Sequence, residues 1–247
     1  PHIHAENIWP DWLTSFADHY LTVGQQLHAA GLRILAGCAL ALGLDDETTF
    51  TATVDGGPHV FRLLRYLPVT AEQVEQGVLW GEEHTDFNLL TLLPGGRFFD
   101  PDGAPCARPD TESGLYLRTR GHRSETGEQI HGVAPAGCIV AQVGQQLEIL
   151  SGGRFLATPH EIRPPRRPGF SRMSAAHFIH MRSDAIVFPL EPFCDEEAVV
   201  AYRPPRTAGT YGLKTLVDIG LAPPEALAEL GYRQYGRLAA IRADEAS

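Results

Sequence analysis

The sequence lacks the features that mark membrane, secreted and nucleic-acid-binding proteins. No apolar run approaches the ~20 residues that a membrane-spanning helix needs. The first residues show no charged stretch followed by an apolar segment, as a signal sequence would. Basic residues are in deficit, with 20 Lys and Arg against 30 Asp and Glu and a formal net charge of -10. We therefore expect no nucleic-acid partner and no membrane partner.

Cysteine is scarce and shows no pairing pattern. Cys38, Cys106, Cys138 and Cys194 are widely spaced, and no C-x-x-C pair occurs. This is neither a disulfide framework nor a zinc-binding pattern, and it predicts a cytoplasmic protein. Internal repeats, a Gly/Ser linker and a G-x-G-x-x-G motif are also missing. What is present is 247 residues, 43% of them hydrophobic, which is enough to bury a sizeable core.

The spacing of apolar residues predicts a mainly β chain with helices at both ends. An apolar stripe at helical spacing runs from Leu13 to Leu42 and predicts a long helix that ends near Gly43. Short strand-like runs with Gly and Pro turns follow. These runs cover residues 60–67, 81–93, 114–117, 138–143, 154–162 and 171–181. The pattern favours a double-stranded β-helix, or jelly roll, packed on the long N-terminal helix.

We expect one domain over residues 1–247. Its expected parts are a helical lead-in at 1–43, a jelly-roll core at about 58–205 and a C-terminal helical segment at about 206–247. Within the last part, helices are expected at 223–230 and 233–241. Turn residues dominate residues 98–130, so we expect a long loop there.

Residues 81–93 carry the most suggestive pair of side chains. His84 and Asp86 are separated by one residue, and on a strand such residues point to the same side of the sheet. An imidazole nitrogen and a carboxylate oxygen suit Fe(II) when one more His completes the set. His160 stands in a later strand-like run and is the candidate for that third ligand. For an isolated H-x-D, a packed core His beside a surface Asp remains an alternative.

A second pair follows twelve residues after His160. Arg172 and Ser174 again have one residue between them, so one strand face would carry a guanidinium and a hydroxyl. A guanidinium inside a β core is costly unless an anion meets it, and a carboxylate matches its fork geometry. The alternative is an Arg172 that lies on the outer face of the sheet and is solvated.

Other stretches follow the order of the motifs of a known family. They are Asn7 to Pro10 (NIWP), 64–68 (LRYLP), 114–117 (GLYL) and 143–155, where Gln145 stands in place of the usual Asp. Together with H-x-D, the distal His and R-x-S, they resemble the isopenicillin N synthase-like family of Fe(II)/2-oxoglutarate-dependent oxygenases. The resemblance covers most of the chain.

The resemblance implies an enzyme with a ferrous centre. His84, Asp86 and His160 would hold Fe(II), and 2-oxoglutarate would bind with its distal carboxylate on Arg172 and Ser174. The implied reaction uses O2 and releases succinate and CO2 while a small-molecule substrate is hydroxylated, desaturated or cyclised. The sequence does not identify that substrate.

Two further residues are weaker candidates. The family often has a Tyr near Tyr66, so this residue would contact 2-oxoglutarate or be a packed aromatic. Asn88 follows Asp86 at the same-face spacing, so it would border the substrate.

The chain also departs from the family. The usual segment before N-x-W-P, which helps to cover the active site, is expected to be absent. The interval from Asp86 to His160, 74 residues, is longer than usual, and the surplus falls in 98–130. That loop would be a specificity element or a surface excursion, since long surface loops cost little.

Alternative functions remain open at this point. Some family members use the same iron ligands and keep R-x-S without using 2-oxoglutarate, so an iron-dependent oxidase is one. A non-catalytic metal-binding barrel is another. A zinc hydrolase fits poorly, because R-x-S would have no purpose in it.

Overall fold

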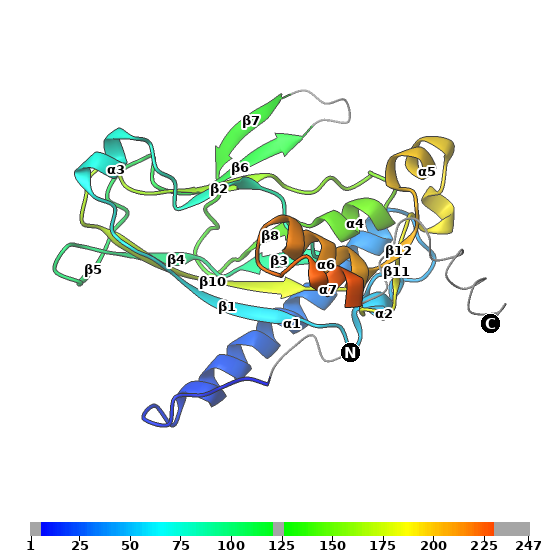
Figure 1. Ribbon diagram of the computed structural model, residues 1–247, viewed down its shortest axis with the longest axis horizontal. Coiled ribbons are helices and arrows are strands. Elements are labelled where there is room, and N and C mark those ends of the chain that lie inside the picture. The colour runs from blue at the N-terminus through cyan, green and yellow to red at the C-terminus, as the bar shows by residue number, and fades with distance from the viewer. Residues whose placement is uncertain (1–5, 121–125, 230–247) are drawn as a thin grey trace.

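The computed structural model describes residues 6–120 and 126–229. Within these ranges the chain forms two main antiparallel sheets and a short two-stranded pair. A long helix lies along one of the main sheets, and most of the short helices gather at one end (Figure 1). This confirms the predicted mainly β, jelly-roll architecture with flanking helices. That residues 1–247 form a single domain stays a prediction.

Six of the described strands form the larger sheet. They are β1 (Val60–Tyr66), β3 (Leu90–Leu93), β4 (Gly96–Phe99), β5 (Pro105–Cys106), β8 (Val140–Val143) and β10 (Ser171–Ile179). Strand β10 lies at the centre: β1 pairs along one edge, and β4 and then β3 pair along the other. The two ends of β10 therefore face different neighbours, and Arg172 lies at the end that pairs with β4.

The smaller sheet has the order β2-β9-β6-β7 within the described residues. Its strands are β2 (Gly81–His84), β6 (Gly114–Arg120), β7 (Thr126–His131) and β9 (His160–Arg163). A short pair, β11 (Ile186–Val187) with β12 (Arg206–Thr207), lies apart from both sheets. In the smaller sheet β9 lies between β2 and β6, so residues far apart in the sequence meet at β9.

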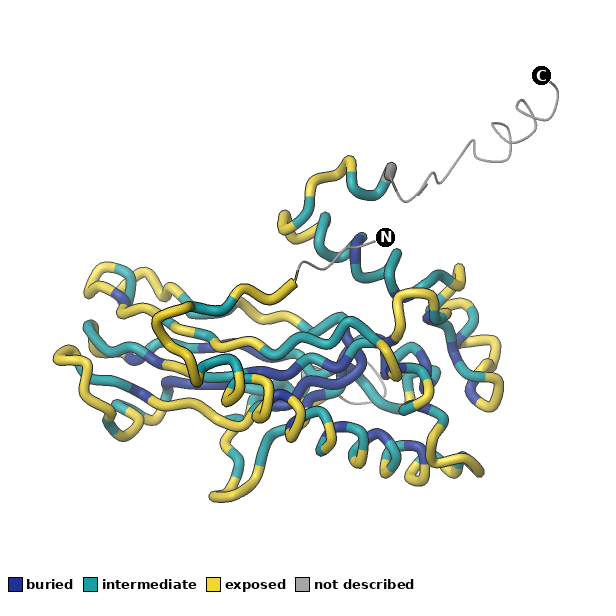
Figure 2. The backbone as a smooth tube through the Cα atoms, turned by 90° about the horizontal axis from the view of Figure 1, so that it is seen from below, coloured by how far each residue is buried: buried dark blue, intermediate teal, exposed yellow. Residues whose placement is uncertain are grey.

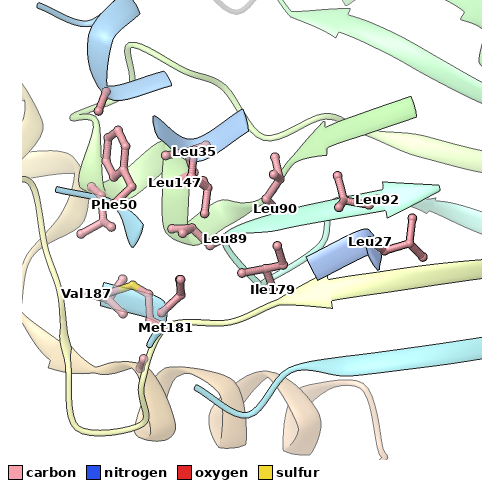
Figure 3. Close-up of a cluster of buried hydrophobic side chains, with 14 residues drawn as sticks. Leu27, Leu35, Phe50, Leu89, Leu90, Leu92, Leu147, Ile179, Met181 and Val187 are labelled. Atoms are coloured by element: carbon pink, nitrogen blue, oxygen red, sulfur yellow. The ribbon is translucent and has the colours of Figure 1, made fainter. Parts of the chain in front are cut away.

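Helix α1 (Phe16–Ala41) packs against the larger sheet through one stripe. Gly31 allows this close approach, because a Cβ there would lie 2.2 Å from Ile179 Cδ1. Figure 3 shows Leu27 and Leu35 of α1 in one cluster with Leu92 and Ile179 of the sheet. Full burial of each such side chain contributes about 1.5–3 kcal/mol. The predicted long helix therefore exists, and it serves as scaffold.

The remaining helices are short. They are α2 (Thr51–Val54), α3 (Ala71–Glu75), α4 (Gln145–Leu150), α5 (Glu196–Tyr202), α6 (Ala208–Asp218), α7 (Glu225–Glu229) and the 3-10 turn η1 (Glu191–Phe193). Thr207 caps α6, since its hydroxyl accepts a hydrogen bond from Thr210 N. Buried residues concentrate in β3, β9 and β10 and along one side of α1, whereas exposed residues lie mainly in loops and on outer helix faces (Figure 2). Among the described helices, none is both long enough and apolar enough to span a bilayer.

Several local predictions are wrong. Residues 81–93 were expected to form one strand, but they form two, β2 and β3, which belong to different sheets. Residues 85–89 between them are not part of either sheet. The loop-rich stretch at 98–130 contains β5 and most of β7, which were not predicted, while β6 confirms the strand expected at 114–117 and extends it to Arg120. In the run 154–162 only the end is strand, since β9 begins at His160.

The helical predictions are mixed. Helices α4 and α5 lie within the expected jelly-roll core and were not predicted, whereas α6 lies within the C-terminal helical segment expected at about 206–247. The helix expected at 223–230 corresponds to α7. The helix expected at 233–241 lies outside the described residues.

Candidate metal centre

The end of β2, the loop after it and the start of β9 bring three candidate ligands together. His84 faces His160 as a register pair, and their ring centroids are 4.3 Å apart. Asp86 Oδ1 is 3.7 Å from His84 Nε2 and 4.0 Å from His160 Nε2. Among the described residues, this is the one group of His, Cys, Asp and Glu side chains whose donor atoms all lie within 4.8 Å of one another.

Backbone carbonyls fix the tautomer of both imidazoles. His84 Nδ1 is 2.7 Å from Glu82 O, and His160 Nδ1 is 3.1 Å from Thr158 O. A carbonyl oxygen only accepts, so each Nδ1 carries the hydrogen and each Nε2 keeps a free lone pair. Both Nε2 atoms are the ones that approach Asp86.

Electrostatics keep His160 available as a neutral ligand. Burial lowers the pKa of His160, the Asp86 carboxylate opposes this, and the His84 ring lowers the pKa again. The His160 side chain is 9% exposed, whereas that of His84 is 53% exposed. One imidazole is therefore fixed in the interior and the other stands at the opening.

A short chain of hydrogen bonds orients the carboxylate of Asp86. Thr91 Oγ1 on β3 donates to Asp86 Oδ2 at 2.6 Å. Asn88 Nδ2 in turn donates to Thr91 Oγ1 at 3.0 Å and to Leu90 O at 2.8 Å. Oδ2 is thus occupied, and Oδ1 is left to face the two imidazoles.

The donor set fits a divalent first-row metal ion. Two donors that share one ion at ~2.1 Å lie about 3.0–3.6 Å apart, so the observed separations need only a small closure. Two nitrogens and one oxygen from one side leave the other positions of the ion open, which is the arrangement of Fe(II) oxygenases. The residues present therefore fit Fe(II).

Arg172 is buried in the larger sheet with part of its hydrogen-bonding capacity unused. The residue is 8% exposed, and its Nη1 has no hydrogen-bond partner among the residues that the structure describes. Burial lowers the pKa of the guanidinium, and the Tyr66 hydroxyl partly offsets this. The guanidinium carbon lies 5.3 Å from the Tyr66 ring centroid and 5.9 Å from that of Phe98. A cation enclosed by aromatic rings with a free N–H is suited to a carboxylate.

The space for that guanidinium is created by a glycine. A Cβ on Gly96 would lie 2.6 Å from Arg172 Nη2, so no other residue fits there without displacing the arginine. Gly96 pairs with Ser174 across β4 and β10. The turn-like sequence around Gly96 thus conceals a residue on which the Arg172 pocket depends.

One cavity connects the arginine to the three candidate ligands. It has a volume of about 890 Å³, and its lining includes His84, Asp86, His160, Arg172, Ser174 and Tyr66. Six of the seven predicted site residues therefore border one space. Tyr66 both borders it and packs on Trp80, with ring centroids 5.4 Å apart, so the two interpretations of this residue are compatible.

A second cavity, of about 670 Å³, lies on another side of the same centre. Its wall combines β1, β10, the loop after β2 and α6, and it also includes His84 and Asp86. Asn88 borders this second cavity, but its amide is committed to Leu90 and Thr91. The strand argument for Asn88 is wrong, because residues 85–89 are not a strand. The geometry makes Asn88 a support for the Asp86 carboxylate.

The sequence pattern of the 2OG-Fe(II) oxygenase superfamily matches residues 58–181, half of the chain. The chain belongs to this superfamily. The matched range begins before β1 and ends just after β10, so it contains the three candidate metal ligands and Arg172.

Relatives within the superfamily agree with this assignment. The chain is 29% identical to a 2-oxoglutarate-dependent ethylene/succinate-forming enzyme of Ralstonia nicotianae, over 76% of this chain and 53% of the relative. It is 31% identical to a homoarginine-6-hydroxylase of rice, over 78% and 52%. The chain thus spans about half the length of these relatives.

A solved structure shows the same fold. The crystal structure of a Caulobacter crescentus protein assigned to the 2OG-Fe(II) oxygenase family aligns with a TM-score of 0.68 and 27% identity. The alignment covers 87% of this chain and 63% of that one. Fe(II) and 2-oxoglutarate are the cofactors that give this family its name.

Sequence reasoning missed several residues that shape the site. Thr91 and Gly96 act across strands, and no local pattern marks either of them. Gln145 was noticed only as a departure from the family's Asp. Arg62 on β1 borders both cavities, and nothing in its local sequence sets it apart from Arg65. Each depends on strand register or on α4, which local periodicity does not reveal.

Proposed function

We propose that this protein is an oxygenase that uses Fe(II), 2-oxoglutarate and O2 to oxidise a small molecule, with release of succinate and CO2. The observation that carries the proposal is the Arg172 guanidinium. It is buried, has an unused N–H and borders the same cavity as the three metal-ligand candidates. A barrel that merely stored a metal ion would gain nothing from an enclosed cation beside it.

Each residue has a defined part in this proposal. His84, Asp86 and His160 would hold Fe(II), which when bound supplies the redox chemistry that O2 oxidation of 2-oxoglutarate and substrate requires. Arg172 would bind the distal carboxylate of 2-oxoglutarate, with Ser174 and Tyr66 beside it. The apolar and aromatic walls around Arg172 limit its contact with water and so strengthen its attraction for an anion.

The substrate would occupy the second cavity, because that cavity also borders His84 and Asp86. Its lining contains Arg62 and Glu82 among mostly apolar side chains of β10 and α6. An arginine and a glutamate on one cavity are complementary to a molecule that carries both a carboxylate and a cationic group. Since the rice relative is a homoarginine-6-hydroxylase, we propose a cationic amino acid of this kind as the first substrate to test.

The proposal is tested by measuring succinate. Metal-free protein is supplied with Fe(II), 2-oxoglutarate and ascorbate, with and without homoarginine or arginine, and succinate is quantified. We expect iron-dependent succinate that increases with an accepted substrate. If a panel of cationic, neutral and acidic small molecules gives oxidised product without succinate, the protein is instead an iron-dependent oxidase. If neither forms and iron still binds, the metal-binding barrel is correct.

Replacing Arg172 tests the 2-oxoglutarate site specifically. A charge-assisted hydrogen bond contributes ~3 kcal/mol, so Arg172→Ala is expected to raise the KM for 2-oxoglutarate by about a hundredfold. The matched control is Arg65→Ala, which removes an exposed arginine of β1 that borders neither cavity. Equal KM values in Arg172→Ala and wild type would remove Arg172 from the site.

A further inference from the structure

The side chain of Gln145 ties the loop that carries Asp86 to helix α6 through hydrogen bonds. We call residues 85–89 the ligand loop. We propose that Gln145 is a positioning residue through which α6 fixes the ligand loop and so sets the affinity of the centre for its metal ion. The inference rests on the proposed function for the identity of that ion, and on geometry alone for the link.

The first half of the link is made by the start of α4. Gln145 N donates to Asp86 O at 2.8 Å, and Gln146 N donates to Asn88 O at 3.0 Å. The first N–H groups of a helix have no partner inside the helix, so they are free to bind the carbonyls of the ligand loop. Gly144 permits the approach, because a Cβ there would lie 2.1 Å from Asn88 O. The ligand loop is not paired in a sheet, and hydrogen bonds from α4 hold its carbonyls instead.

The second half is made by the Gln145 side chain. Gln145 Nε2 donates to Thr85 Oγ1 at 2.7 Å, and Thr85 lies between His84 and Asp86 in the sequence. Gln145 Oε1 accepts a hydrogen bond from the hydroxyl of Tyr211 on α6. A carboxamide is a donor at one end and an acceptor at the other, so it joins a hydroxyl acceptor to a hydroxyl donor. The family's usual Asp has a shorter side chain and, when ionised, no donor.

Helix α6 is well placed to transmit its position. Burial raises the pKa of Tyr211, which keeps the phenol protonated and able to donate. The next residue, Gly212, packs against Phe87 of the ligand loop, since a Cβ there would lie 3.3 Å from the ring. Helix α6 also forms a wall of the second cavity. A displacement of α6 would therefore shift Thr85 and Phe87, the residues on either side of Asp86.

The test compares two variants that cut the link with one that does not. Tyr211→Phe removes only the hydroxyl that Gln145 accepts from, and Gln145→Ala removes the bridge. The matched control is Tyr20→Phe, which removes a phenol hydroxyl that bonds Phe61 O between α1 and β1, away from the centre. Co(II) is the probe, and its dissociation constant is measured by absorption titration. Loss of a group that orients metal ligands typically weakens metal binding tenfold to a hundredfold, and we expect that range for both variants but not for the control.

A second readout does not depend on the metal. Hydrogen exchange of the backbone amides of Leu89 and Gln145, which bond Ile179 O and Asp86 O, is followed in the metal-free protein. Tyr211→Phe is expected to speed exchange at both, while Tyr20→Phe leaves them at the wild-type rate. If Gln145→Ala does not fold, the Co(II) affinity and the exchange rates of Tyr211→Phe alone test the proposal.

The outcomes separate the two proposals. Failure of the wild-type protein to bind Co(II) would refute the metal centre. The exchange rates would still test whether α6 fixes the ligand loop through Gln145. Wild-type Co(II) affinity and exchange in Tyr211→Phe would overturn the link and leave the metal centre standing. An equal loss in Tyr20→Phe would also overturn it, because the effect would then be general destabilisation.

Discussion

Asp86→Ala is expected to lower the rate of iron-dependent succinate formation by at least about a thousandfold. The carboxylate is the one anionic donor in the group, and its loss is expected to remove ~4 kcal/mol from the metal-dependent step, which corresponds to that factor. The fold should survive, because within the described residues the Asp86 side chain accepts one hydrogen bond, from Thr91. Thr91 Oγ1 has Asn88 Oδ1 at 3.2 Å as an alternative acceptor, so no buried donor is left unpaired.

The control for this prediction lies three residues away. Glu83→Ala removes a carboxylate that forms an exposed ion pair with Arg118 and borders neither cavity. Such pairs contribute at most about 1 kcal/mol to stability, so turnover should stay within twofold of wild type. Succinate formation is measured at saturating Fe(II), and far-UV circular dichroism confirms the fold. Substantial turnover in Asp86→Ala would show that the carboxylate is not a metal ligand.

The chemistry of the site was predictable from residue types, although the local reason was partly wrong. His84 and Asp86 were expected on one face of a continuous strand. In the structure β2 ends at His84, and Asp86 reaches the imidazoles because α4 holds the loop carbonyls. The three residues nevertheless lie together, because two His and one Asp form a restrictive donor set, whatever backbone presents them. Arg172 was predictable for a similar reason, since an unpaired guanidinium in a strand needs an anion.

What could not be predicted depends on long-range register. Gly96 matters only because β4 pairs with β10 opposite Ser174, and this pairing joins residues more than seventy apart. Thr91 supports Asp86 only because the chain reverses between β2 and β3. Helix α6 lies in the C-terminal segment that was expected to be helical, but nothing in the local sequence indicates that its Tyr211 meets Gln145. Local periodicity gives element types, but it does not say which elements meet.

A group of histidines between α1 and the sheet makes acid destabilisation the other large expected effect. His28 of α1 stacks near His59, with ring centroids 4.4 Å apart, and His28 Nδ1 lies 3.3 Å from His177 Nε2 of β10. Burial and then the neighbouring His28 lower the pKa of His59 to about 4, although the Val54 carbonyl and Asp55 partly oppose this. Burial, followed by the charges of His28 and His59, lowers the pKa of His177 to about 4.

The sign of the effect follows from these directions. In the unfolded chain both histidines bind protons near pH 6.5, whereas in the folded protein they do so only near pH 4. The unfolded state therefore takes up protons first as the pH falls, and folding stability is full above pH 6.5 and lost between 6.5 and about 4. One pKa unit corresponds to 1.4 kcal/mol, or ~3 kcal/mol for each ring alone. Both pKa shifts include the charge of His28, and that of His177 also includes the charge of His59, so the two contributions overlap. Because His59 is also only half-buried, we expect about 3 kcal/mol for the pair.

Urea unfolding of the metal-free protein at pH 7.0 and pH 4.5 measures this loss. His177→Phe fills the same buried space without a titrating group, and His59→Asn keeps an acceptor for the His180 N–H that now bonds His59 Nδ1. In the double variant the difference in unfolding free energy between the two pH values should shrink by about 3 kcal/mol. The control is His19→Gln, at an exposed position of α1, which should leave the difference as in wild type. An unchanged pH difference in the double variant would mean that other groups, such as the carboxylates, account for the acid sensitivity. Comparing the pH difference of the double variant with that of the wild type cancels the contributions of groups present in both, including His84, Asp86 and His160. The change that remains therefore comes from the histidine cluster.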